Sequence, residues 1–153
     1  MLLSWFDEAV RWLVARGQTG QWGSEPFSEQ PNRVEQVRAL ASGGGLRIAE
    51  HDGQPVGALA VGDAPAYAPS VYRPELYIIL LLTSRQHAGQ RIGDVLVRRA
   101  IGEARAANRE LLRVDCWSGA PDLVRWYEAQ GFKRTQTFDR NGWIGQVFSM
   151  PLS

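Results

Sequence analysis

Cysteine and histidine, the residues that build most disulfides and zinc sites, are scarce in this chain. Cys116 is its one cysteine, which excludes an internal disulfide and any metal site built from several thiolates. His51 and His87 are its two imidazoles, so we expect no zinc site and no other metal centre. The lone thiol stands in an apolar stretch, and we interpret it as an inert part of the core rather than a nucleophile.

The sequence also lacks a strong charge of one sign and a long hydrophobic run. A formal net charge of +1 gives no global field that would recruit nucleic acid or an acidic membrane surface. The longest apolar run, Leu76 to Leu82, is far shorter than the ~20 residues of a membrane-spanning helix. No secretory signal is visible. We therefore expect a cytoplasmic protein without nucleic-acid or membrane partners, whose 153 residues form a single domain.

Hydrophobic periodicity and turn signals predict a mixed succession of helices and strands. Ser4-x-x-Asp7 resembles a capping box and opens a helix that runs to Gly17, followed by a loop from Gln18 to Gln30. The turn signals of two hairpins are Asp52-Gly53 and Asn141-Gly142. The other predicted elements are a helix from Pro31 to the glycines at 43–45, strands over 46–49 and 56–61, a loop over 62–74, a strand buried on both faces over 76–82, a helix over 92–107, a strand over 111–117, a helix from Pro121 to Gly131, and strands over 132–138 and 146–150. This order indicates an α/β fold, a mixed sheet with helices on both faces.

The stretch from Leu80 to Ala107 organises the chain. An apolar strand leads through polar residues around Gly89 into an amphipathic helix, whose start aims free N–H groups and the positive end of the helix dipole at one point. This arrangement predicts an anion site of the kind that binds phosphate. A P-loop is excluded because Ile92-Gly93-Asp94 stands where Gly-Lys-Ser/Thr is required. A Rossmann turn is excluded because its set of glycines and its later acidic residue are not in place.

Two segments resemble the GNAT superfamily of N-acetyltransferases. Ala88 to Gly93 aligns with the family's Gln/Arg-x-x-Gly-x-Gly/Ala loop, with Gly93 in place but Ala88 and Arg91 at the first and fourth positions. Tyr127-Glu128-Ala129-Gln130-Gly131-Phe132 matches the family's Tyr-Glu-x-x-Gly-Phe segment. Ala120 departs from the asparagine that often stands seven residues before that tyrosine. The resemblance covers roughly residues 33–150 and implies a GNAT-like, mostly antiparallel sheet. The predicted order departs from the family in one respect, because the strand that usually precedes the first helix is missing: either the chain begins late or the sheet does without that edge.

The resemblance implies acetyl-coenzyme A (acetyl-CoA) as the acetyl donor and a primary amine of a small molecule or peptide as the acceptor. Provided that the central strand splays from the strand at 111–117, the thioester and pantetheine would be held along Leu81, Leu82 and Thr83. Tyr127, one turn after Leu123 on the short helix, would give a proton to the leaving thiolate, and Leu123 would border the cofactor. The residues of the pyrophosphate loop would be Ala88, Gly89, Gln90, Arg91, Ile92 and Gly93. A homodimer is one of the assemblies open to such a chain.

The acceptor side leaves alternatives open. Glu75 and Glu25 are both candidates for the base that takes a proton from the amine, and no spacing separates them. Trp22 and Trp143 stand in predicted loops, where they either wall an acceptor pocket or pack as core or lid. Tyr127 itself has plain core packing as the rival to its catalytic role.

Two other functions compete with acetyl transfer. A non-catalytic acyl-CoA-binding or regulatory module with the same fold would accommodate the departures at Ala88, Arg91 and Ala120. A helix-rich interaction domain would make the turn at 88–93 purely structural. Binding of acetyl-CoA separates the last of these from the others, and amine-dependent release of thiol separates enzyme from binding module.

Overall fold

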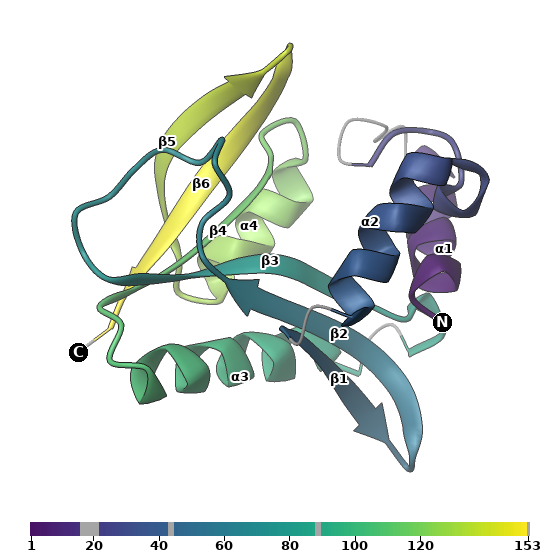
Figure 1. Ribbon diagram of the computed structural model, residues 1–153, viewed down its shortest axis with the longest axis horizontal. Helices are drawn as coiled ribbons and strands as arrows, with labels where there is room; N and C mark the ends of the chain where they lie inside the picture. The colour runs from purple at the N-terminus through teal and green to yellow at the C-terminus, as the bar shows by residue number, and fades with distance from the viewer. Residues whose placement is uncertain (16–21, 43–44, 88–89, 153) are drawn as a thin grey trace. The chain divides into compact units, whose positions relative to one another are not determined.

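The computed structural model describes residues 1–15, 22–42, 45–87 and 90–152 (Figure 1). Contacts within the chain group into two compact units: Met1–Ala60 with Leu80–Leu96, and Val61–Ile79 with Val97–Ser153. We call them unit 1 and unit 2 and describe each by itself. The elements in chain order are α1 (Leu2–Ala15), the 3-10 helix η1 (Phe27–Glu29), α2 (Pro31–Ser42), β1 (Leu46–His51), β2 (Gln54–Gly62), β3 (Glu75–Thr83), the 3-10 helix η2 (Arg85–His87), α3 (Ile92–Ala106), β4 (Leu111–Trp117), α4 (Pro121–Ala129), β5 (Lys133–Arg140) and β6 (Trp143–Pro151).

The six strands are ordered β1-β2-β3-β4-β6-β5. The pairs β1–β2, β4–β6 and β5–β6 are antiparallel, and β3–β4 is the parallel pair. This arrangement confirms the predicted mixed, mostly antiparallel sheet. Within residues 1–15 no strand precedes α1.

Three local predictions are wrong. The first helix begins at Leu2 rather than after Ser4, because the Trp5 amide already donates to the Met1 carbonyl at 3.2 Å. Trp143 lies in a strand and not in a loop, since Asn141 and Gly142, both with positive φ, close a two-residue turn and allow pairing up to Trp143. The central strand is not buried on both faces throughout, because the Ile79 side chain is 41% exposed. The predicted end of the first helix at Gly17 and two of the glycines at 43–45 lie outside the described residues.

Unit 1 has an aromatic and aliphatic core between its helices and strands. Phe6 of α1 stacks on Phe27 of η1 with ring centroids 4.4 Å apart. Ser28 ties η1 to α1 by donating its amide and its hydroxyl to the Asp7 carboxylate, at 3.1 and 2.6 Å. The buried residues of this core are Leu2, Trp5, Phe6, Ala9, Val10, Phe27, Val37, Ala58, Ala60, Leu80 and Leu82. Figure 1 shows α1 and α2 lying side by side over one face of β2.

The start of α3 packs on the other face of β2, at Gly57. A Cβ atom built on Gly57 would lie 2.8 Å from Ile92 Cγ2, 3.2 Å from Leu96 Cδ1 and 3.3 Å from the Leu82 carbonyl oxygen. The missing side chain is therefore what lets the first two turns of α3 approach the strand. Helices cover both faces of the sheet in unit 1, as predicted.

Unit 2 is built on the β4–β6–β5 ladder, which α4 covers on one face. Val114 is the Cα partner of Phe148, and the Tyr127 ring of α4 lies 5.2 Å from the Phe148 ring. Because side chains alternate along a strand, Arg113 and Asp115 point to the opposite face. On that opposite face the loop between β2 and β3 contributes Pro69, whose carbonyl oxygen accepts a hydrogen bond from Arg113.

Gly57→Ala should destabilise the protein by about 1–3 kcal/mol, because the new methyl group overlaps Ile92 and cannot be accommodated without moving α3. The measurement is urea unfolding. Gly62→Ala is the matched control on the same strand, since a Cβ there meets nothing within 4 Å. Equal free energies of unfolding for the two variants would show that α3 does not depend on close approach at Gly57.

Candidate functional site

The predicted anion site is the first turn of α3. β3 ends at Thr83, and the next residue, Ser84, is buried and donates its amide to the Val56 carbonyl at 2.9 Å. Ile92 follows as the first residue of α3, with its side chain buried against β2. The first amides of any helix have no acceptor within the helix, so this turn offers donors and the positive dipole end to an anion. Ala88 and Gly89 lie outside the described residues.

Arg91 occupies a glycine-like backbone position. Its φ is +57°, a left-handed conformation that glycine adopts without strain and other residues rarely adopt. Its side chain points outward, 84% exposed, and its Nε donates to the Asp94 carboxylate at 2.6 Å. The backbone therefore has the geometry that a glycine would give this loop, while the guanidinium compensates an acidic group beside the helix start.

A cavity of about 360 Å³ borders the same turn within unit 1. Its apolar lining comes from β2 and α3, through Val56, Ile92 and Val95. The other lining residues are Ala49, Glu50, His51 and Gln90. Two residues of the predicted pyrophosphate loop, Gln90 and Ile92, thus lie at the edge of a hollow.

The parallel ladder between β3 and β4 is short. Within unit 2 it pairs Glu75–Tyr77 with Leu111–Arg113, and Ile78 and Ile79 of β3 pair with no residue of β4 there. The roles of Leu81, Leu82 and Thr83, which belong to unit 1, stay a prediction. Leu82 has its side chain in the core, so only its main chain is available to a ligand.

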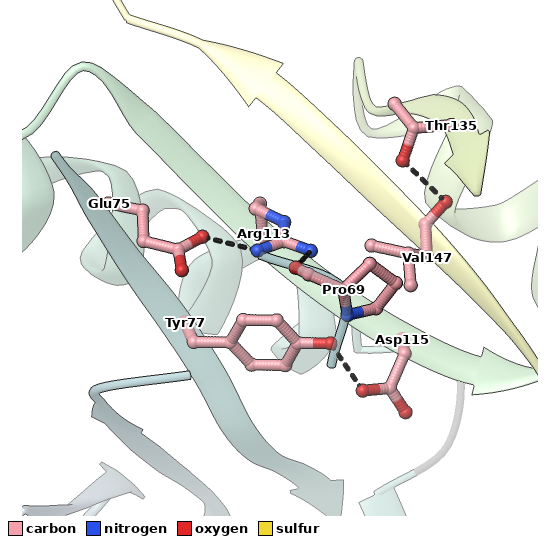
Figure 2. A network of polar contacts seen from close by, with 7 residues as sticks. All are labelled: Pro69, Glu75, Tyr77, Arg113, Asp115, Thr135 and Val147. Carbon is pink, nitrogen blue, oxygen red and sulfur yellow. Dashed lines mark hydrogen bonds and ion pairs between the residues drawn. The ribbon is translucent and has the colours of Figure 1, made fainter. Parts of the chain in front are cut away.

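Glu75 is engaged by a buried arginine. Arg113 is 1% exposed and donates to the Glu75 carboxylate and to the Pro69 carbonyl, both at 2.7 Å (Figure 2). The Glu75 carboxylate is therefore engaged in an ion pair with a side chain of the neighbouring strand. The geometry therefore gives Glu75 a structural role and weakens its candidacy as the base.

Asp115 is the acidic residue that sequence reasoning missed. Tyr77 donates its hydroxyl to Asp115 Oδ2 at 2.5 Å, and Figure 2 shows the two side chains meeting between β3 and β4. Burial raises the pKa of Asp115 above its usual range, against the opposing effects of the Tyr77 hydrogen bond and the cations Arg140 and Arg113. A carboxyl whose pKa moves toward neutrality suits a general base. The available signal was an acidic residue in a predicted strand that is otherwise mostly apolar.

Tyr127 lies on the opposite face, with its ring buried among aromatic side chains. Ring centroids of Trp126, Phe132 and Phe148 lie 5.0 to 5.8 Å away. Its hydroxyl has no hydrogen-bond partner among the described residues. Burial, followed by the nearby Cys116 and Asp115, raises the pKa of Tyr127 far above its ordinary value, so the phenol stays protonated at any working pH.

The remaining predicted site residues are distributed over both units. In unit 1, Trp22 packs edge-on against Phe6 at 5.2 Å, which supports core packing over a pocket wall, and Glu25 is exposed. In unit 2, Leu123 is half-buried on α4, and the Trp143 ring lies 5.8 Å from that of Phe138. Cys116 is buried as predicted, and burial raises its thiol pKa to about 12. Glu25 thus has none of the features that mark Asp115.

No group of three or more His, Cys, Asp or Glu side chains in the described residues could hold a metal ion. Over the same residues, no helix is both long enough and apolar enough to cross a membrane.

Comparison with known proteins matches residues 7–132 to the acetyltransferase (GNAT) family. A ribosomal-protein-alanine N-acetyltransferase from Brucella melitensis has a TM-score of 0.67 at 22% identity, over 99% of this chain and 92% of that one. A putative acetyltransferase from Salmonella typhimurium with its cofactor acetyl-CoA has a TM-score of 0.65 at 19% identity, over 99% and 87%. A GNAT family acetyltransferase from Elizabethkingia anophelis with acetyl-CoA bound has a TM-score of 0.61 at 16% identity, over 77% and 82%. No curated protein matches the chain.

Arg91→Gly should leave stability unchanged or raise it by up to about 1 kcal/mol, because glycine relieves the positive φ while the exposed ion pair with Asp94 contributes little. Arg91→Ala loses the same ion pair and keeps the strain, so it should be less stable than Arg91→Gly. Thermal and urea unfolding of both variants measure the difference. Greater stability of Arg91→Ala would mean that the left-handed conformation carries no strain here.

Asp115→Asn should change the pH dependence of stability. The native state holds its proton on Asp115 to higher pH than the unfolded state, so wild type loses stability as pH rises from about 4 through the native pKa. The asparagine oxygen can still accept the Tyr77 hydroxyl, and the variant has no such titration. Urea unfolding between pH 4 and 8 should therefore show the variant gaining on wild type as pH rises. A constant difference across this range would contradict the raised pKa.

Proposed function

Because the chain belongs to the acetyltransferase (GNAT) family, we propose that it moves the acetyl group of acetyl-CoA to a primary amine of a small molecule or peptide by direct attack. The whole chain acts as one acetyltransferase domain in this proposal. Tyr127 and Asp115 carry the two proton transfers, and the first turn of α3 carries the phosphates.

One observation in unit 2 supports this proposal more than any other. Within unit 2 the β3–β4 pairing ends at Arg113, and a candidate acid and a candidate base stand on opposite faces of the next stretch of β4, from Val114 to Trp117. Asp115 belongs to the stretch itself, and Tyr127 is close enough to Cys116 for that thiol to affect its pKa. A thioester beside this stretch would have a proton acceptor on one side and a proton donor on the other.

The two residues have complementary tasks. The amine nitrogen attacks the thioester carbonyl carbon, Asp115 takes the amine's proton directly or through water, and the carbon–sulfur bond breaks. The sulfur leaves with the electron pair of the broken bond, and Tyr127 gives it the proton of its hydroxyl group. Since the pKa of Tyr127 is raised, the phenol is neutral before the reaction and recovers its proton from solvent afterwards.

The residues of the α3 turn fit a phosphate-bearing donor. Close packing at Gly57 fixes the helix start, and the backbone at Arg91 has the conformation of a glycine loop. Gln90, Arg91, Ile92 and Gly93 would contact the pyrophosphate through their amides, and Leu81 and Thr83 the pantetheine through their main chain. Arg91 would also screen the Asp94 carboxylate from the phosphates.

A non-catalytic acyl-CoA-binding module is the second candidate, and one observation favours it. Ala120 is the N-cap of α4 and makes no side-chain cap, so the helix that carries Tyr127 lacks an anchor that asparagine could provide. Acetyl-CoA binding without amine-dependent thiol release would support this alternative over the enzyme.

Tyr127→Phe should lower turnover by about 100-fold at saturating acetyl-CoA, because only the proton donor is removed while the ring keeps its packing. Release of free thiol with a panel of amines measures turnover, and calorimetric titration measures acetyl-CoA affinity, which should stay within about 3-fold. Tyr72→Phe is the control, since that side chain is fully exposed. Full activity in Tyr127→Phe would return the residue to a packing role.

A further inference from the structure

Aromatic rings gather on the face of unit 2 that carries Asp115. The Tyr67 and Phe138 rings lie 5.2 Å apart, and the Phe138 and Trp143 rings 5.8 Å apart. Gly145 makes room for two of them, because a Cβ there would lie 2.2 Å from Phe138 Cζ and 2.7 Å from Trp143 Cζ3. Three rings on one face form an apolar surface beside the carboxyl group.

The strand register places these groups on the same face as the acid. Asp115 is the Cα partner of Val147 on β6, and Gly145 lies two residues before Val147, on the same side. Phe138 of β5 is in turn the Cα partner of Gly145. Tyr67 is also close enough that the Asp115 charge contributes to its raised pKa.

The two arginines of this face differ in their contacts. Arg113 is buried and held by Glu75 and Pro69. Arg140 is exposed, lies over the Tyr67 ring with its Cζ atom 4.1 Å from the centroid, and makes no ion pair or hydrogen bond within the described residues. It is also near enough to Asp115 to lower the pKa of that carboxyl group. The face therefore combines the Asp115 carboxyl group, a guanidinium without an ion pair among the described residues, and a group of aromatic rings.

We propose that the acceptor is a free amino acid with an apolar side chain, a primary amine with a carboxylate beside it. The inference rests on the proposed function. Asp115 faces the amine, Arg140 binds the carboxylate, and the rings of Tyr67, Phe138 and Trp143 contact the hydrocarbon side chain. Since Arg140 would repel a second positive charge, polyamines are disfavoured. An N-terminal residue of a peptide is disfavoured as well, because its amine has no adjacent carboxylate for Arg140 to bind.

Each arm of the test changes one charge. Apolar amino acids, their carboxamides and linear diamines are compared as acceptors by thiol release at saturating acetyl-CoA. Wild type should favour the amino acid over its carboxamide by about 10-fold or more in kcat/KM, since only the carboxylate can pair with Arg140. Arg140→Gln should abolish this preference, mainly through a higher KM, and leave the carboxamide unaffected. Arg134→Gln, on the same strand with its guanidinium beside Glu128, should behave as wild type.

The outcomes separate this inference from the function on which it rests. Turnover of carboxamides or diamines equal to that of amino acids would overturn the inference and leave acetyl transfer standing, as would an undiminished preference in Arg140→Gln. If no amine releases thiol, the proposed acetyl transfer is wrong. The inference is then tested by binding alone, with the amino acid and its carboxamide titrated into wild type and Arg140→Gln. Binding of the amino acid that is selective over the carboxamide and lost in Arg140→Gln supports it, and any other binding pattern overturns it.

Discussion

The buried ion pair between Arg113 and Glu75 is the contact on which unit 2 depends. The Arg113 guanidinium is 1% exposed, and its two terminal nitrogens donate to a carboxylate on β3 and to the carbonyl of Pro69 in the preceding loop, while its Nε has no partner among the described residues. Removal of one partner of such a pair costs about 3–5 kcal/mol, because the other charge is left buried. Arg113 also stands on the last paired rung of β3 and β4, opposite Tyr77. One side chain therefore ties two strands and a loop where strand pairing ends.

The residues of β4 with candidate chemical roles lie just beyond the end of that pairing. Up to Arg113 the strand has neighbours on both edges, and within unit 2 the residues from Val114 to Trp117 pair with β6 alone. The Tyr77–Asp115 hydrogen bond is the next contact between the two strands, made by side chains rather than backbone. Strand alternation then places Asp115 on one face and Cys116, beside Tyr127, on the face that α4 covers. The same alternation aligns the aromatic rings and Arg140 with Asp115.

Much of the fold could be predicted from local pattern because each element has a local signal. Pro31 opens α2, Asp52-Gly53 turns β1 into β2, and the helical stripe after Gly93 became α3. The errors lie where a tertiary contact replaces a local signal. Ile79 belongs to an unbroken apolar run, yet it is exposed on a strand that continues past its pairing with β4. The turn signal before Trp143 predicts a loop at this residue, although the two-residue turn is tight enough for Trp143 to pair with Arg140.

By itself the sequence determined the family, the strand–turn–helix at 76–93 and the segment that carries Tyr127, because these depend on residue spacing along a few turns of chain. Tertiary structure alone decided what surrounds each carboxylate. Glu75 and Asp115 are similar acids in a list of residues, but a buried arginine binds the first, while burial and a tyrosine hydroxyl surround the second. It also decided that Arg113 is held in a buried ion pair, whereas Arg140 stacks on Tyr67 and makes no ion pair within the described residues. The charge state of a side chain, and whether it can still bind a ligand, depend on neighbours from distant parts of the chain. Residue spacing does not encode those neighbours.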